Sequence, residues 1–303
     1  MTDLEEDDLS GDVEVRLPTQ AVDEEPASGV QIADAQRDDV ESLIHADHSG
    51  GPAADGLERI GHVGRNEYRE YPPLGLGHVA RCGWEQRITG GLLIHRVIPD
   101  NCADILVGDD GAAQLVGPAT RVDLPRLSDG SHVRGLRLEP YAIRAVFGVD
   151  ADELTDRSFP LDAVLDGRSA RLVAEAVWAP GAAAGAWLRE RWRDVRPDRA
   201  TVAIVRTLTA PDAPAVDTVA DRTGFSSRHL RRLVRAETGL TPKTLHRVAR
   251  VHEFLRRAEE DRYAVGAAAA AAGYADQPHA SREIRALTGL TPARLLAARR
   301  APH

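Results

Sequence analysis

The chain has 303 residues, a net charge of -9 and 43% hydrophobic residues, which is enough for two ordinary domains. Residues 1–60 carry 17 acidic side chains against three arginines, whereas residues 200–303 carry 17 basic side chains against ten acidic ones. This asymmetry is expected when one part of a chain meets phosphates and another does not. The overall acidity therefore does not exclude a nucleic-acid-binding protein.

The composition excludes several other classes. Cys82 and Cys102 are too few for a disulfide framework and form no zinc-type pair. The N-terminus has no secretory signal pattern, and the longest alanine-rich run, Ala264–Ala272, is much shorter than the roughly 20 residues that a bilayer crossing needs. Because 37 arginines beside the single Lys243 indicate a GC-rich genome, we expect a bacterial protein. The low cysteine content and the lack of a long apolar run predict a cytoplasmic protein without a membrane partner, and no cofactor is expected.

Three regions follow one another. Residues 1–60 have no sustained apolar period and are predicted to be an acidic disordered tail. Residues 61–197 are predicted to form an α+β sensor or regulatory domain with an antiparallel sheet or small barrel. Its expected strands are His78–Ile88, Gly91–Ile98, Ala103–Val107, Gln114–Val116 and His132–Leu138, and its expected helices are Tyr141–Phe147, Leu165–Val177 and Ala183–Asp194.

Residues 198–303 are predicted to be all α-helical and contain an internal repeat. The segment Thr238-Gly239-Leu240-Thr241-Pro242 recurs unchanged as Thr288-Gly289-Leu290-Thr291-Pro292. His229 and Arg232 recur at the same offset of fifty residues, as His279 and Arg282. Five consecutive identities in register with other matches indicate a duplicated unit.

The first copy, about residues 216–238, matches a helix-turn-helix. Val216, Val219 and Ala220 face inward on a short helix, Gly224 allows the left-handed turn, and Ser226 is a good N-cap. Leu230, Leu233 and Val234 would then face the first helix. The outward residues are Ser227, Arg228, Arg231, Arg232 and Arg235, and arginine on such a helix suits guanine edges and phosphates in a major groove.

The second copy, about residues 265–288, has an alanine-rich first helix and one extra residue in the turn. Its second helix is expected from about Pro278 to Leu287. The outward candidates are Gln277, His279, Ser281, Arg282 and Arg285. With fewer arginines, this half is expected to contribute less affinity for DNA.

A linker helix over about residues 242–260 is predicted between the copies, with Leu245, Val248, His252 and Leu255 along one face. Eighteen helical residues span roughly 27 Å. Such a strut can hold two recognition helices about one DNA turn apart, in successive major grooves.

The region from about Thr201 to Arg299 resembles the AraC family of transcription regulators in its Gly-Phe start, its His-Leu-x-Arg-Leu segment and the Gly-Leu-Thr-Pro ending of each unit. The resemblance implies a seven-helix, double helix-turn-helix DNA-binding domain. By position, it places base reading on Arg228, Arg231 and Arg232 in the first unit. In the second unit, it places base reading on Gln277, His279, Ser281 and Arg282.

The middle region is similar to an N-terminal domain found in a branch of these regulators. The similarity rests on Tyr71-Pro72-Pro73, Val97–Ile105, Leu115–Pro118 and Gly135–Pro140. It implies a sensor role and names no ligand. Weak ligand-binding candidates are Arg137, Cys102 and Asp104. Alternatively, Arg137 forms an internal salt bridge, and the cysteines are buried structural residues beside a turn that Asp side chains stabilise.

The expected function is a sequence-specific, DNA-binding transcription regulator modulated by a ligand or partner of the N-terminal domain. Double-stranded DNA is the main expected partner, with a small-molecule effector, RNA polymerase and a second copy as further partners. A protein-interaction adaptor with a helical repeat that no longer reads DNA is the alternative. No catalytic motif occurs, so an enzyme is not expected.

Overall fold

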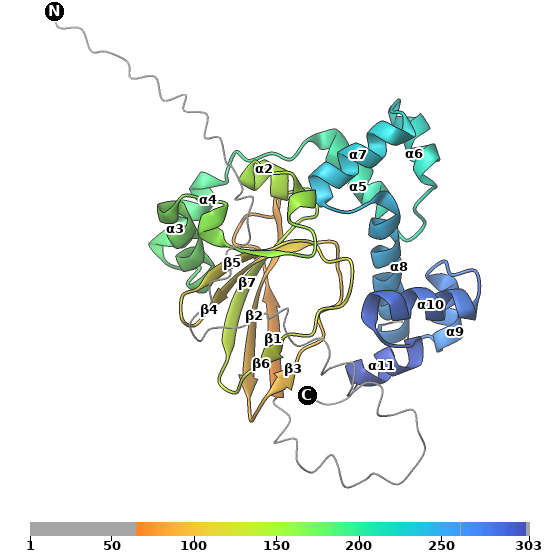
Figure 1. Cartoon of the computed structure of the whole chain (residues 1–303), viewed down its shortest axis with the longest axis horizontal. Coiled ribbons are helices and arrows are strands. Elements are labelled where there is room, and N and C mark those ends of the chain that lie inside the picture. The colour runs from red at the N-terminus through yellow and green to blue at the C-terminus, as the bar shows by residue number, and fades with distance from the viewer. Residues whose placement is uncertain (1–64, 261, 301–303) are drawn as a thin grey trace, which may run out of the picture.

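The computed structural model describes residues 65–260 and 262–300, so the expected acidic tail, residues 1–60, lies outside the described residues. A β-rich part with its own helices is followed by a helical part built around one long helix (Figure 1). The expected α+β class, with an antiparallel sheet before an all-helical region, is confirmed. None of the helices that the structure describes is long and apolar enough to cross a membrane.

The main sheet has the strand order β1-β2-β7-β4-β5-β8, and all neighbouring strands are antiparallel. A second, two-stranded sheet pairs β3 with β6. The bounds are β1 (Arg65–Tyr71), β2 (Ala80–Thr89), β3 (Leu93–Ile94), β4 (Ala103–Gly108), β5 (Ala113–Val116), β6 (Arg126–Leu127), β7 (His132–Leu138) and β8 (Ser158–Pro160).

The expected strand Gly91–Ile98 is shorter than predicted, because only Leu93–Ile94 joins a ladder as β3. Beyond Ile94 the partner segment reaches Pro125, which has no N–H to donate. Pairing resumes only as an isolated bridge between Val97 and Asp123. Strands β1, β6 and β8 were not predicted. β1 is a largely exposed edge strand without apolar alternation, β6 has two residues and β8 has three.

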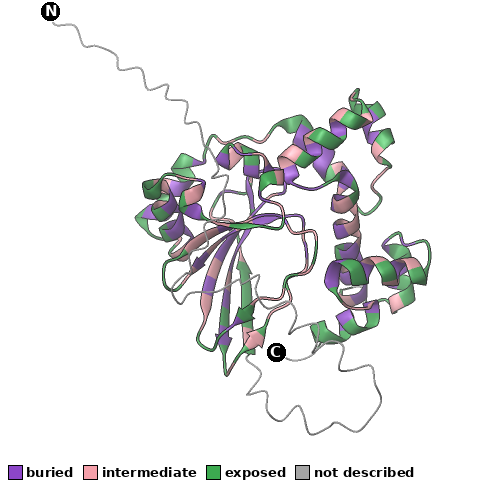
Figure 2. Ribbon diagram, viewed as in Figure 1, coloured by how far each residue is buried: buried purple, intermediate pink, exposed green. Residues whose placement is uncertain are grey.

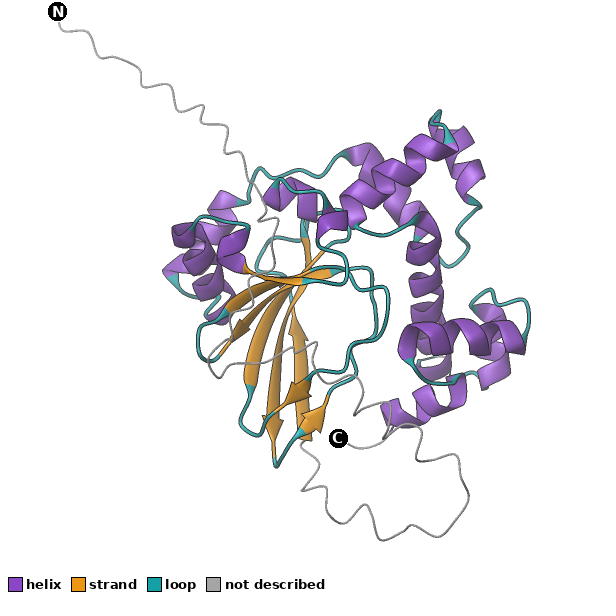
Figure 3. Cartoon of the chain, in the orientation of Figure 1, coloured by secondary structure: helices purple, strands orange, loops and turns teal. Residues whose placement is uncertain are grey.

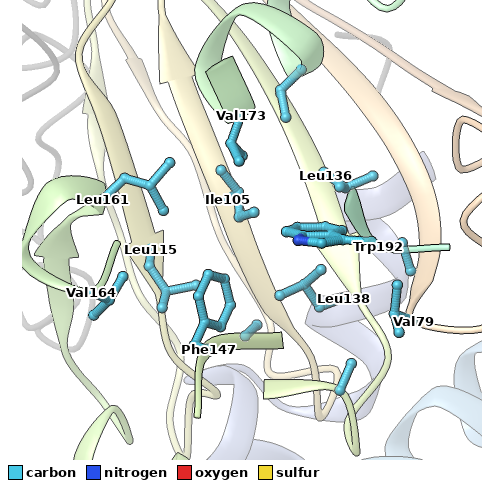
Figure 4. Close-up of a cluster of buried hydrophobic side chains, with 14 of the residues drawn as sticks. Val79, Ile105, Leu115, Leu136, Leu138, Phe147, Leu161, Val164, Val173 and Trp192 are labelled. Carbon is cyan, nitrogen blue, oxygen red and sulfur yellow. The ribbon is translucent and has the colours of Figure 1, made fainter. Parts of the chain in front are cut away.

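Helices cover one face of the main sheet and form its core. The helices are α2 (Ile143–Phe147), α3 (Gly167–Trp178) and α4 (Ala183–Arg191), with short 3-10 turns η4 (Ala151–Glu153) and η5 (Leu161–Ala163). Val173 of α3 and Trp192 pack over Ile105, Leu136 and Leu138 of the sheet (Figure 4). These sheet residues are almost completely buried, and each such side chain contributes about 1.5–3 kcal/mol of hydrophobic stabilisation.

Seven helices lie among the described residues from Arg199 to Arg300, as the resemblance implied (Figure 3). They are α5 (Arg199–Leu208), α6 (Val216–Thr223), α7 (Ser227–Thr238), α8 (Pro242–Glu259), α9 (Val265–Ala271), α10 (Gln277–Thr288) and α11 (Pro292–Arg300). Helix α8 is the linker helix, and each of its ends packs into a separate hydrophobic core. The buried positions at both ends of α8 are visible in Figure 2.

Candidate nucleic-acid interface

The first helix-turn-helix unit consists of α6 and α7. Gly224 ends α6 with φ 72°, in the left-handed region, and the Ser226 side chain accepts a hydrogen bond from the backbone N–H of His229 at 3.2 Å. Val219 and Leu230 are buried between the helices, together with neighbouring apolar residues of α5 and α8. The predicted turn, N-cap and inward faces are therefore confirmed.

The arginines of α7 point away from this core. Arg228, Arg231 and Arg232 are all exposed. Nη2 of Arg231 lies 3.5 Å from Oδ1 of Asp217 on α6, in a surface ion pair that contributes little to stability. The outward face of the recognition helix is thus accessible to a duplex.

Two other candidates of the first unit are engaged within the chain. The Ser227 hydroxyl donates to Asp217 at 2.5 Å and is half-buried. Arg235 is exposed, but its Nε lies 3.3 Å from a carboxylate oxygen of Asp152 in η4. Arg235 therefore points toward the β-rich part, at the end of α7 away from Arg228.

The second unit consists of α9 and α10 and repeats the first in detail. Asp276 is the N-cap of α10 and accepts from the backbone N–H of His279 at 2.6 Å, as Ser226 does from His229. The rings of Tyr274 and His279 pack edge-on with their centroids 5.4 Å apart. The rings of Phe225 and His229 pack in the same way, with their centroids 4.8 Å apart. The extra residue in the turn is thus absorbed before the N-cap, and α10 begins at Gln277, one residue earlier than expected.

The candidates on α10 differ in accessibility. Gln277, Arg282 and Arg285 are exposed, whereas Ser281 and His279 are half-buried. His279 lies 3.8 Å from the carboxylate of Glu283, one turn further along the helix. The open face of the second unit therefore carries two arginines, compared with three on the open face of the first.

Glu283 belongs to the interface, although the sequence pattern did not indicate it. Its side chain is only 10% exposed and lies 3.2 Å from Nε of Arg247 and 3.4 Å from Nε of Arg250, both on α8. It occupies the position that Leu233 holds in the first copy, so a break in the repeat was the available signal. Glu283 fixes α10 against the linker helix through charge, where the first unit uses an apolar contact.

The repeated Thr-Gly-Leu-Thr-Pro segment forms the same corner in both units. The Thr238 hydroxyl donates to Val234 O at 2.7 Å and accepts from Leu240 N at 3.2 Å. Thr288 makes the equivalent bonds with Ile284 O and Leu290 N at the same distances. We call residues 238–242 and 288–292 the two corners. Each is a rigid turn from a recognition helix into the next helix.

The β-rich part contacts both corners and the linker helix. At the first corner, the Thr155 hydroxyl donates to Gly239 O at 2.8 Å. At the second corner, Nη1 of Arg96 donates to Thr288 O at 2.7 Å. Between them, Nδ2 of Asn101 donates to Leu245 O at 3.1 Å, and His252 Nε2 lies 2.7 Å from Pro99 O.

His252 departs from its expected place. The helical spacing predicts His252 on the apolar face of the linker helix, but the residue is exposed and contacts the β-rich part. Leu245, Val248 and Leu255 are buried as expected. His252 lies seven residues beyond Leu245, on the same side of the helix, and both residues contact the β-rich part.

Arg137, a weak ligand candidate, lies inside a cluster of carboxylates. Its Nε is 3.0 Å from Asp100 and 3.3 Å from Asp104, and Nη1 is 3.5 Å from Glu70. Asp104 also accepts from the indole N–H of Trp84 at 2.7 Å. These carboxylates therefore engage both Nε and Nη1 of the guanidinium.

The two cysteines are buried and free. Burial raises the pKa of the Cys82 thiol to about 11 and raises that of the Cys102 thiol well above its ordinary value. Neither thiol therefore has the lowered pKa that favours a reactive thiolate. Among the described residues, no group of three or more histidine, cysteine or acidic side chains is arranged to hold a metal ion.

Comparisons with known families match both parts of the chain. Residues 219–298 match the family described as a helix-turn-helix domain, and residues 68–160 match a domain of unknown function, DUF6597. The chain is a DNA-binding transcription regulator. It carries an AraC-type helix-turn-helix domain behind a DUF6597 domain.

Solved structures give looser similarities, and no curated protein matches. The C-terminal domain of AraT, a response regulator from Geobacillus stearothermophilus, is 20% identical with a TM-score of 0.29 and covers 33% of this chain and 82% of its own. ToxT from Vibrio cholerae is 9% identical with a TM-score of 0.36, over 78% of this chain and 95% of its own. ToxT with a bound unsaturated fatty acid is also 9% identical, with a TM-score of 0.34 over 78% and 92% of the two chains.

Proposed function

We propose that this regulator binds a specific DNA sequence through α7 and α10, and that its N-terminal domain modulates this binding. The proposed DNA-binding domain is residues 198–303 and the proposed sensor domain is residues 61–197. The observation that carries the proposal is the pair of equivalent recognition helices, fixed at the two ends of α8 with arginines on their open faces. The proposed DNA contacts are Ser227, Arg228, Arg231, Arg232, Arg235, Gln277, His279, Ser281, Arg282 and Arg285.

The first unit is proposed to supply most of the affinity. Arg228, Arg231 and Arg232 lie on consecutive turns of one helix, where guanidinium groups reach guanine O6 and N7 in a major groove. On α10, His279 is partly engaged by Glu283, so base reading there depends more on Gln277 and Arg282. The engagement of Arg235 by Asp152 supports a link between its availability to DNA and the position of the β-rich part.

The proposed modulation rests on the contacts at the two corners. Because Thr155 and Arg96 contact equivalent corners, at Gly239 and Thr288, a shift of the β-rich part is transmitted to both recognition helices. A ligand of the sheet has a short path to the linker helix. Arg137 binds Asp100, and the next residue, Asn101, binds Leu245 of α8. We propose the Arg137 cluster, with Asp104 and Cys102, as the place where an effector would act on this path.

Selective binding tests the DNA-reading part of the proposal. Duplexes selected from a random pool should bind the full chain far more tightly than scrambled duplexes, with a steep loss of affinity as salt rises. Arg232→Ala should cost about 1–3 kcal/mol of binding free energy and relax the preference at one or two base positions. Arg171→Gln, on α3 of the β-rich part, is the matched control for loss of an exposed arginine. Equal binding of all sequences, or no binding, would support the adaptor alternative instead.

Modulation requires a separate measurement. Arg96→Met removes the contact at the second corner and leaves the recognition faces intact. The variant should differ from the unchanged protein in its affinity for a duplex with both half-sites. Its affinity for a duplex with only the half-site that the first unit binds should equal that of the unchanged protein. If the ratio of the two affinities stays the same, the corner contacts do not govern how the two units bind together.

A further inference from the structure

A cleft lies between the two recognition helices, on the linker helix. It has a volume of about 560 Å³ and is lined by both helix-turn-helix units and by one face of α8. Its cationic lining residues are Arg231 of α7 and Lys243, Arg247 and Arg250 of α8. The cleft is separate from the Arg137 cluster and from the contacts between α8 and the β-rich part.

The cleft faces away from the β-rich part. Lys243, Arg247 and Arg250 are spaced by four and three residues, so they share one face of α8. His252, which contacts Pro99, lies nine residues beyond Lys243, which is about 180° around a helix with 3.6 residues per turn. It lies five residues beyond Arg247, which is about 140° around the helix. The cationic face therefore stays open while the β-rich part remains attached.

The cleft carries a net positive charge. Four cationic side chains are opposed there by Asp217 and Glu283. Burial and the nearby Arg250 hold the pKa of His246 below its ordinary value, so His246 adds no charge at neutral pH. Glu283 pairs with Arg247 and Arg250 and holds them in the wall, whereas Lys243 is exposed at the edge.

We propose that this cleft binds the phosphodiester backbone of the DNA segment that crosses between the two half-sites, with Lys243 as the phosphate contact. The inference rests on the proposed function. When two recognition helices enter successive major grooves, the backbone that borders the intervening minor groove passes over whatever joins them. The compact ammonium of Lys243 is a suitable partner for phosphate oxygens there.

Contacts of this kind position the duplex and carry no sequence information. They set the distance between the half-sites, because the backbone must pass the linker helix at a fixed place. The predicted signature is therefore a change in salt dependence and overall affinity, with the ratio of specific to scrambled binding unchanged.

Lys243 is the only lysine in the chain, which allows a direct experiment. An amine-reactive acylating reagent followed by mass spectrometry reports one side chain besides the α-amino group. A duplex carrying both half-sites should protect Lys243 several-fold, and a duplex carrying one half-site should protect it less. No protection by the full site would overturn the proposal. Protection by millimolar inorganic phosphate but not by duplex would identify a small-anion site and would also overturn it.

Salt titration supplies the second measurement. Lys243→Gln should lower the slope of log affinity against log salt concentration by about 0.9, the value for one lost phosphate contact on B-DNA. Lys243→Arg should restore the slope, and Arg171→Gln should leave it unchanged. Two results would overturn the cleft inference while the proposed function stands. In both, the unchanged protein binds selectively, and Lys243→Gln either keeps the salt slope of the unchanged protein or alters base preference as Arg232→Ala does. If the unchanged protein shows no selective binding, the proposed function itself fails.

Discussion

Gly239→Ala tests the contact between the first corner and the β-rich part. Gly239 has φ 72°, and a Cβ built there would lie 2.6 Å from Oγ1 of Thr155, 2.7 Å from Ala151 O and 2.7 Å from Cγ of Pro118. All three atoms belong to the β-rich part. Gly224 supplies a matched control, since it has the same φ of 72° and a Cβ there would meet nothing within 4 Å.

The two substitutions share one cost and differ in the other. A non-glycine residue in the left-handed conformation costs about 1–2 kcal/mol, and both variants carry that cost. Gly239→Ala must also displace a backbone oxygen and a proline ring, and overpacking of this kind costs about 1–3 kcal/mol. We therefore expect Gly224→Ala to lose about 1–2 kcal/mol of unfolding free energy and Gly239→Ala to lose about 2–5 kcal/mol.

Urea unfolding can follow the two parts separately. All four tryptophans, Trp84, Trp178, Trp187 and Trp192, lie in the β-rich part, so their fluorescence reports its unfolding. Circular dichroism in the far ultraviolet is dominated by the helices. Gly239→Ala should separate the two transitions, because the strained contact joins the two parts, whereas Gly224→Ala should leave the fluorescence transition in place. Equal costs for both variants, with coincident transitions, would refute the reasoning.

Two further predictions concern ionisable groups. Hydrogen bonds from Arg256, and also from Arg257, lower the pKa of Glu253, so its contribution to stability is complete above the unfolded-state pKa of about 4.3 and is lost as pH falls through the lower folded-state value. Glu253→Gln should therefore lower the unfolding free energy by about 1–2 kcal/mol at neutral pH, and by less at each step below pH ~4, as measured by urea titration. A difference in unfolding free energy that does not change with pH would contradict this assignment. Because burial raises the pKa of both thiols, Cys82 and Cys102 should react with iodoacetamide at mildly alkaline pH far more slowly than in urea, and rates similar to those of the unfolded chain would contradict the buried placement.

The helical part was largely predictable from the sequence. The duplicated corner, the glycine turn at Gly224 and the Ser226 N-cap are local signals, and each specifies backbone geometry within a few residues. The linker helix followed from apolar spacing between the two copies. The structure differs from the predicted bounds by one residue at each end of α10 and by one at the end of α8.

The contacts that join the parts were not predictable. Arg96 and Thr288 are 192 residues apart, and neither residue type indicates a partner by itself. Asn101 adopts φ 69°, which is compatible with many kinds of turn, while its bond to Leu245 depends on the docked arrangement. Glu283 was missed because its position in the helix pattern favoured an apolar residue. Such features depend on the tertiary arrangement, which composition and periodicity leave undetermined.

The stripe of α8 that contacts the β-rich part and the stripe that carries Lys243 are on opposite sides of one helix. An effector and a duplex would then not compete for the same surface. If the duplex lies on the Lys243 side, the regulator can remain on its operator while its sensor changes state. A response to the effector would appear as a changed fit between two half-sites on occupied DNA, rather than as release from the chromosome.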